Sequence, residues 1–153
     1  MQPRGYQIDL SAGIDKEWAA GKRNVLAVLP TGGGKSLLAG MKVLENGGHS
    51  AVIAHREELT SQMALALAVC GVQHRVIGDT KLVKTIVQDQ IRELGQSFFN
   101  PNATTAVAGV DTLIRRKDQL ANWLPQVSRW IIDEGHHVLR ANKWGEAVSM
   151  FPN

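Results

Sequence analysis

A run of three glycines at residues 32–34, followed by Lys35 and Ser36, constrains the fold more than any other stretch. A short apolar run at residues 25–29 precedes it, and good helix formers follow from Ser36 to Glu45. Glycine allows a tight curl in which successive backbone N–H groups point inward, and the start of a helix adds the positive end of its dipole. The stretch therefore predicts strand, glycine loop and helix, with a pocket for a polyphosphate.

The side chains around this loop suit such a ligand. Thr31 and Gly32, Gly33 and Gly34 would surround the phosphates, Lys35 would reach the β- and γ-phosphates, and the Ser36 hydroxyl would hold Mg²⁺. The general phosphate-loop pattern has a glycine where this chain has Leu29, so the match fails at its first position. The alternative is a flexible glycine-rich turn with an exposed lysine.

Short apolar runs alternate with amphipathic stretches along the rest of the chain. This alternation predicts an α/β fold with a mostly parallel sheet and helices on both faces. Its 153 residues suit a single domain, residues 1–153. The predicted strands are residues 25–29, 51–54, 73–77, 104–108 and 129–132, and the predicted helices are residues 36–45, 57–69, 81–94 and 111–116.

Two acidic residues, Asp133 and Glu134, follow the last predicted strand. Ligands of open α/β sheets bind at the carboxyl ends of the strands. We expect Asp133 to hold Mg²⁺ through water and Glu134 to act as a general base on an attacking water. A solvated acidic turn is the alternative. His136 and His137 argue only weakly for zinc, because adjacent histidines do not easily share an ion and no cysteine or third histidine is placed to help.

Composition excludes several classes of protein. Apolar residues make up 44% of the chain, too many for a disordered protein, and no apolar run is long enough to cross a membrane. The single cysteine, Cys70, excludes an internal disulfide. The net charge of +3 is compatible with nucleic acid but does not demonstrate it. We expect a soluble, intracellular (cytoplasmic) protein.

The glycine motif at residues 30–36 precedes the acidic motif at residues 133–136. With these two motifs in this order, the chain resembles the N-terminal RecA-like, P-loop NTPase lobe of a superfamily 2 helicase of the DExH type. It looks most like the type III restriction and DNA-repair branch. Residues 4–10 resemble the element of that family in which a glutamine reads adenine, so the resemblance implies Gln7 and Arg4 as ATP-binding residues, although Gly5 replaces the usual proline. It also implies that His136 couples hydrolysis to neighbouring motifs. ATP and Mg²⁺ are the implied cofactors.

Two further segments, residues 52–59 and 107–116, resemble elements that hold the nucleic-acid backbone in this family. By that resemblance Arg56, Thr112, Arg115 and Arg116 contact phosphates, of DNA rather than RNA. A solvated helix end is the alternative for Arg115 and Arg116. Family members continue to a second RecA-like lobe with an arginine finger, so we expect the isolated lobe to turn over ATP slowly or undetectably.

Three classes of function remain open at this point. The first is an ATP-dependent helicase, or a translocase that does not separate strands, such as a restriction-enzyme motor subunit. The second is a P-loop kinase, which explains Lys35 and Ser36 but gives no role to Gln7 or to residues 52–59. The third is a non-catalytic module that uses ATP as a switch or only grips DNA.

Overall fold

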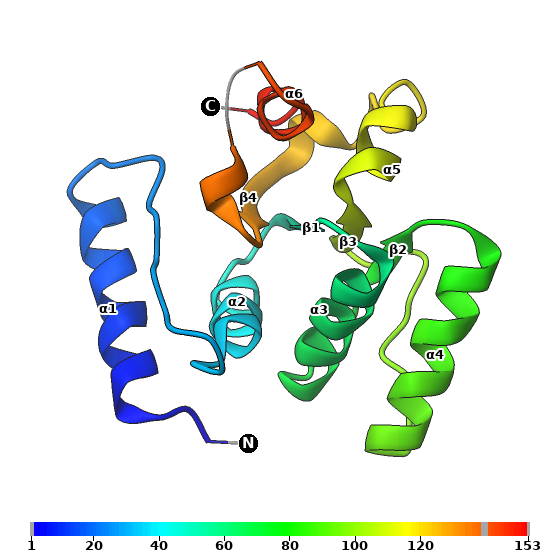
Figure 1. The fold of residues 1–153 in the computed structure, drawn as a ribbon, viewed down its shortest axis with the longest axis horizontal. Coiled ribbons are helices and arrows are strands. Elements are labelled where there is room, and N and C mark those ends of the chain that lie inside the picture. The colour runs from blue at the N-terminus through cyan, green and yellow to red at the C-terminus, as the bar shows by residue number, and fades with distance from the viewer. Residues whose placement is uncertain (1, 139–140, 153) are drawn as a thin grey trace.

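The computed structural model describes residues 2–138 and 141–152, which form a parallel sheet with helices on both faces (Figure 1). The order of the four strands is β2-β3-β1-β4, and each neighbouring pair is parallel. Their bounds are β1 (His49–Ala54), β2 (Arg75–Ile77), β3 (Thr105–Gly109) and β4 (Val127–Ile132). The predicted α/β class is confirmed.

The central strand β1 is buried on both faces, because its side chains alternate between two apolar clusters. Ala51 and Ile53 belong to one cluster, and Val52 and Ala54 belong to the other. This period of two is the geometry of an extended strand, and an uninterrupted apolar run is what a doubly covered parallel strand requires.

Three helices cover one face and two cover the other. The first cluster receives apolar side chains from α5 (Val110–Arg115) and α6 (Lys143–Ser149). The second receives them from α2 (Lys35–Leu44), α3 (Glu57–Val69) and α4 (Thr80–Leu94). Two single 3₁₀ turns, η1 (Leu124–Gln126) and η2 (Gly135–His137), flank β4.

Most predicted elements occur where the sequence pattern indicates them. The helix at residues 57–69 has the predicted bounds, and the helices predicted at residues 36–45, 81–94 and 111–116 differ by at most one residue at each end. The pattern did not indicate two helices, α1 (Gly5–Ala19) and α6. None of the helices in the described part of the chain combines the length and hydropathy that crossing a bilayer requires.

The predicted strand at residues 25–29 is wrong. These residues form no strand, and Leu26 and Val28 are 70% and 77% exposed. The segment lines one wall of a cavity whose opposite wall is β4, the edge strand of the sheet. The apolar composition of these residues favours extended backbone, but a strand also needs a partner strand about 4.9 Å away. Here a cavity separates residues 25–29 from β4, so no ladder forms.

Candidate nucleotide site and nucleic-acid face

Three strands end together and place the segments that follow them at one edge of the sheet. In the ladder, Ala54 of β1 lies opposite Gly109 of β3, and Ile53 lies opposite Ile132 of β4. The segments that contain Arg56, Thr112 and Asp133 therefore leave the sheet side by side. This is the edge at which parallel α/β sheets bind ligands.

The glycine loop has a backbone that requires glycine. Gly32 and Gly34 have positive φ angles of 77° and 79°, which side chains with a Cβ rarely adopt. Gly33 donates its N–H to the carbonyl of Pro30 at 2.9 Å, and a Cβ on Gly33 would lie 2.9 Å from that oxygen. The α2 helix begins directly afterwards at Lys35. The loop and the helix start are those predicted from the sequence.

Gln7, the predicted adenine reader, contacts this loop in the structure. Its side-chain amide nitrogen donates to the carbonyl of Gly33 at 3.1 Å, and its amide oxygen accepts the N–H of Arg4 at 2.8 Å. The Tyr6 hydroxyl donates to the same Gly33 carbonyl at 3.1 Å. Gln7 lies in α1 (Gly5–Ala19) and is only 2% exposed. The predicted ATP-binding residue Arg4 is exposed, and its Nη1 lies 3.2 Å from the Tyr6 hydroxyl.

These contacts orient the loop. In a trans peptide the C=O and the following N–H point in opposite directions. The Gly33 carbonyl points at Gln7 and Tyr6, so the N–H of Gly34 points away from them. Sequence reasoning missed this role, because Gln7 and Gly33 are 26 positions apart and no local pattern indicates their contact.

The two predicted carboxylates follow β4 in a strained turn. Asp133 extends the sheet by donating its N–H to the carbonyl of Ile53 at 2.9 Å, and its Oδ1 accepts the N–H of Glu134 at 3.0 Å. Glu134 has φ 59° and ψ 43° and is the one non-glycine residue with positive φ in the described chain. Such left-handed residues cost about 1–3 kcal/mol and cluster at functional sites.

One cavity of about 1070 Å³ lies between Lys35, which follows the glycine loop, and the carboxylates. Lys35, Asp133, Glu134 and His136 all line it, together with residues 25–29 and β4. The structure therefore brings these four predicted residues to one cavity. The other predicted ATP-site residues lie outside its lining: Arg4, Gln7, Thr31, Gly32, Gly33, Gly34 and Ser36.

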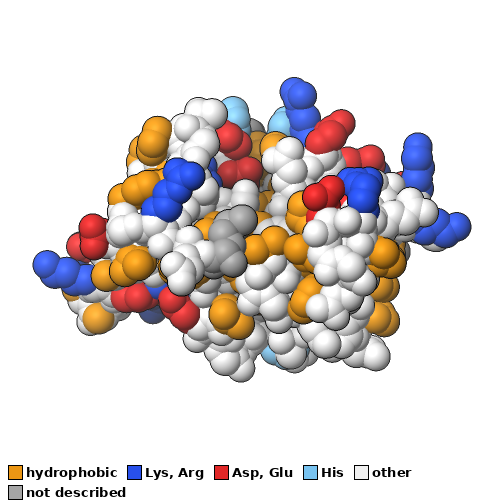
Figure 2. All heavy atoms as spheres, turned by 90° about the horizontal axis from the view of Figure 1, so that it is seen from below, with side chains coloured by type: hydrophobic (Ala, Val, Ile, Leu, Met, Phe, Trp, Pro, Cys, Tyr) orange, Lys and Arg blue, Asp and Glu red, His pale blue; other side chains and the backbone are white. Residues whose placement is uncertain are grey.

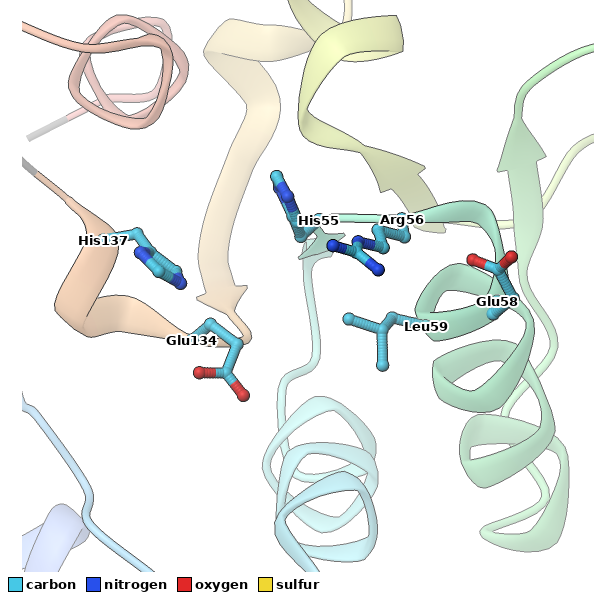
Figure 3. Close-up of a pocket in the computed structure, with 6 residues that line it drawn as sticks. All are labelled: His55, Arg56, Glu58, Leu59, Glu134 and His137. Carbon is cyan, nitrogen blue, oxygen red and sulfur yellow. The ribbon is translucent and has the colours of Figure 1, made fainter.

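Glu134 also lines a smaller cavity of about 410 Å³ (Figure 3). Glu134 and His137 reach it from the turn after β4, and His55 and Arg56 reach it from the segment between β1 and α3. Glu134 lines both cavities, so one carboxylate connects the proposed nucleotide side with a predicted nucleic-acid residue, Arg56.

The other predicted nucleic-acid residues lie on α5, which follows β3 directly. Thr112 is half-buried, Arg115 is exposed and Arg116 is half-buried at the end of this helix. Arg115 Nη2 lies 3.4 Å from the Thr112 hydroxyl. The face seen in Figure 2 carries basic, acidic and scattered apolar side chains, with no continuous basic patch among its described residues.

Comparison with known proteins agrees with this geometry. The sequence matches the family described as type III restriction enzyme, res subunit, over residues 1–153. No curated protein matches the chain.

Two solved structures have a similar fold. The UvsW helicase from bacteriophage T4 is 21% identical with a TM-score of 0.62, and the match covers 99% of this chain and 48% of that one. A nuclease-deletion mutant of the Type ISP restriction-modification enzyme LlaGI, solved in complex with a DNA substrate mimic, is 15% identical with a TM-score of 0.64; the match covers 95% of this chain and 16% of that one. The chain thus spans about half, or less, of these proteins.

The family match covers every residue of the chain, and both structural matches confirm the RecA-like architecture. The chain belongs to the family of type III restriction enzyme res subunits and has the fold of the N-terminal lobe of a superfamily 2 helicase.

Proposed function

We propose that residues 1–153 form one RecA-like lobe of an ATP-driven motor that moves on nucleic acid, DNA rather than RNA, as a helicase or a non-unwinding translocase. The observation that carries the proposal is that Lys35, Asp133 and Glu134 line one cavity at the carboxyl edge of the sheet. A kinase would leave unexplained why Glu134 also borders Arg56. The DNA preference rests on the res-subunit family.

The glycine loop and the carboxylates have different roles in this proposal. The N–H groups of Gly32, Gly33 and Gly34 and the Lys35 ammonium bind the phosphates, with Thr31 at the start of the loop. Ser36 and Asp133 offer hydroxyl and carboxylate oxygens, the donors that Mg²⁺ prefers. Bound Mg²⁺ would neutralise charge that develops on the phosphates.

Three further residues complete the proposed ATP site. Glu134 orients and deprotonates the attacking water. Gln7 and Arg4 bind the adenine end, and Gln7 also holds the Gly33 carbonyl, so base recognition and the phosphate loop share one side chain. His136, whose Nδ1 lies 3.3 Å from Glu134 Oε2, couples the base to the neighbouring motifs.

Nucleic acid lies across the segments after β1 and β3 in this proposal. Arg56, Arg115 and Arg116 neutralise phosphates and Thr112 adds a neutral donor, which tracks the backbone without reading sequence. A second RecA-like lobe in the protein supplies an arginine for the transition state, so the isolated chain binds ATP but turns it over slowly. Such arginines contribute about 10³–10⁵ in rate.

The first test is the Lys35→Ala variant, with calorimetric titration of Mg·ATP. Loss of a charged hydrogen bond of about 1.5–3 kcal/mol lowers affinity about 10–100-fold. The control is Lys81→Ala, which removes an exposed lysine from α4, outside both cavities. Equal affinity of the Lys35→Ala variant and the wild type would reject the phosphate loop.

The second test separates a motor from a kinase or a switch. In the protein with both lobes, Glu134→Gln should bind ATP and release no phosphate. Formation of a phosphorylated acceptor would indicate a kinase, and intact cellular function of Glu134→Gln would indicate a switch.

The third test concerns nucleic acid. Affinity for single-stranded DNA should fall with salt, at a log–log slope of about −0.7 for each phosphate contacted. Arg115→Ala should make the slope shallower, whereas Arg92→Ala on α4, an exposed arginine paired with Asp89 and Glu93, should not. Competition with RNA of the same sequence tests the DNA preference.

A further inference from the structure

Three potential metal ligands come together in the turn after β4. One ligand atom from each of Glu134, His136 and His137 lies within 4.8 Å of the other two. Glu134 Oε2 is 3.3 Å from His136 Nδ1, and the two imidazole ring centres are 4.1 Å apart. Glu134 is half-buried and both histidines are exposed, so an ion can reach the cluster from solvent.

The backbone explains how adjacent histidines converge. Glu134 turns the chain through its left-handed conformation, and the η2 turn then holds His136 and His137 within one tight 3₁₀ turn. No sequence pattern indicates this convergence, because neighbouring residues in a strand point to opposite faces.

The aromatic surroundings also fix His137. Its ring stacks on Trp144 of α6, with centroids 5.9 Å apart and planes at 19°, and the His55 ring lies 6.2 Å away. Trp144 is only 3% exposed, so it is a rigid support. A third histidine is therefore beside the pair, contrary to the sequence-based expectation.

We propose that Glu134, His136 and His137 bind one transition-metal ion of the zinc class, with a water in the fourth position. Two imidazole nitrogens and a carboxylate oxygen form the donor set of three-ligand zinc sites. Mg²⁺ prefers oxygen ligands alone, so this set discriminates against it. Zinc–ligand bonds of about 2.0–2.1 Å in a tetrahedron place ligand atoms about 3.3 Å apart. The Glu134–His136 pair already has that separation, and the His137 ligand atom lies within 4.8 Å of both.

Occupancy would oppose hydrolysis. The ion would hold the Glu134 carboxylate, which could then no longer accept a proton from water. This consequence rests on the proposed function, whereas the binding itself does not.

The test is calorimetric titration of ZnCl₂ into the 153-residue chain without nucleotide. The wild type should bind one ion, and His136→Ala and His137→Ala should each lose at least about tenfold in affinity. The double variant should lose the site. The control is His49→Ala, which removes a histidine at the start of β1, outside the cluster, and should bind like the wild type.

Cobalt gives a second readout, because the visible absorption of Co²⁺ reports four-coordinate binding. We expect a Co²⁺ spectrum that Zn²⁺ displaces and excess Mg²⁺ does not, and that the folded double variant lacks. Circular dichroism verifies that each variant is folded. Unchanged zinc binding by the double variant, no binding by the wild type, or displacement by Mg²⁺ would each overturn the proposal. ATP affinity measured on the same samples shows separately whether the nucleotide site is intact.

Discussion

The sheet and the N-terminal arm, which we define as residues 2–34, contribute to the proposed nucleotide site in different ways. In the sheet, Asp133 and Glu134 follow β4, an edge strand that pairs with β1, where Ile53 is fully buried. The arm carries Gln7 and the glycine loop, lies to one side of the sheet, and exposes Leu26 and Val28 (Figure 1). The carboxylates are thus held by a strand that pairs with the packed core, whereas the glycine loop belongs to a lightly packed segment.

Different forces hold the two regions. Apolar packing holds the sheet. Polar contacts join α1 to α2 and β4: Lys42 of α2 pairs with Asp15 of α1 at 2.8 Å, and with Glu45 at the end of its own helix at 2.6 Å. Arg129 lies 4.3 Å above the Trp18 ring. Asp15 is exposed, so salt screens its pair with Lys42, whereas it does not screen apolar contacts. The attachment of the arm should therefore weaken as the salt concentration rises.

Equal truncations in the two regions give the largest expected contrast. Ile53→Ala should lower the free energy of unfolding by about 2–5 kcal/mol, because it leaves a cavity in the core. Leu26→Ala should change it by less than about 0.5 kcal/mol, because its side chain is largely in solvent. Urea denaturation measures both. A large loss for Leu26→Ala would show that residues 25–29 pack as a strand in solution.

The same contrast explains what the sequence could predict. Strands β1, β3 and β4 and helices α2 to α5 have periodic apolar patterns that report burial, and burial decides their structure. Asp133, Glu134 and Lys35 follow from their places at the ends of such elements. Their shared cavity was expected on that basis.

The remainder depends on contacts that no local pattern contains. Residues 25–29 have the composition of a strand, but pairing depends on a partner strand. The α1 helix lacks a clear apolar stripe, since Asp15 and Trp18 face polar partners on other elements. The contact of Gln7 with Gly33 joins residues 26 positions apart.

The second prediction tests the polar attachment of the arm. Lys42 is 2% exposed and its ammonium contacts both carboxylates, so Lys42→Ala should cost about 1–3 kcal/mol. It should also raise the hydrogen-exchange rate of α1 amides. Lys84→Ala, an exposed position on α4, is the control. If the exchange rates of α1 amides were the same in Lys42→Ala and the wild type, the Lys42–Asp15 pair would not hold the arm.

The third prediction concerns a buried histidine beside the sheet. His74 is fully buried; its Nδ1 lies 2.9 Å from the Val72 carbonyl and its Nε2 lies 2.9 Å from the Gln90 amide nitrogen. The Gln90 oxygen accepts the N–H of Phe98, which directs the amide nitrogen at His74 as a donor. His74 is therefore neutral, with its proton on Nδ1.

Burial lowers the pKa of His74 below its usual value, so acid should destabilise the fold. Below pH about 6.5 the unfolded chain takes up a proton that the folded chain resists. The free energy of unfolding should be constant above that pH with respect to this group and should decrease below it. Denaturation from pH 8 to about pH 5 measures the slope, and His74→Gln should reduce it. An equal slope in His74→Gln would assign the effect to other groups.

The smallest effect concerns Glu134, where the arm and the sheet meet at one cavity. Asparagine tolerates the left-handed backbone better than glutamate, so Glu134→Asn should raise the free energy of unfolding by about 1 kcal/mol or less. Glu134→Gln keeps the strain and should gain nothing, which separates backbone relief from loss of charge. Both variants should lose ATP turnover in the two-lobed protein, because neither retains the carboxylate. Urea denaturation provides the comparison. A higher free energy of unfolding in both variants would assign the gain to the lost charge, and no gain in either would show that the turn relaxes. A gain in Glu134→Asn alone would mean that the proposed catalytic residue occupies a backbone position that costs stability.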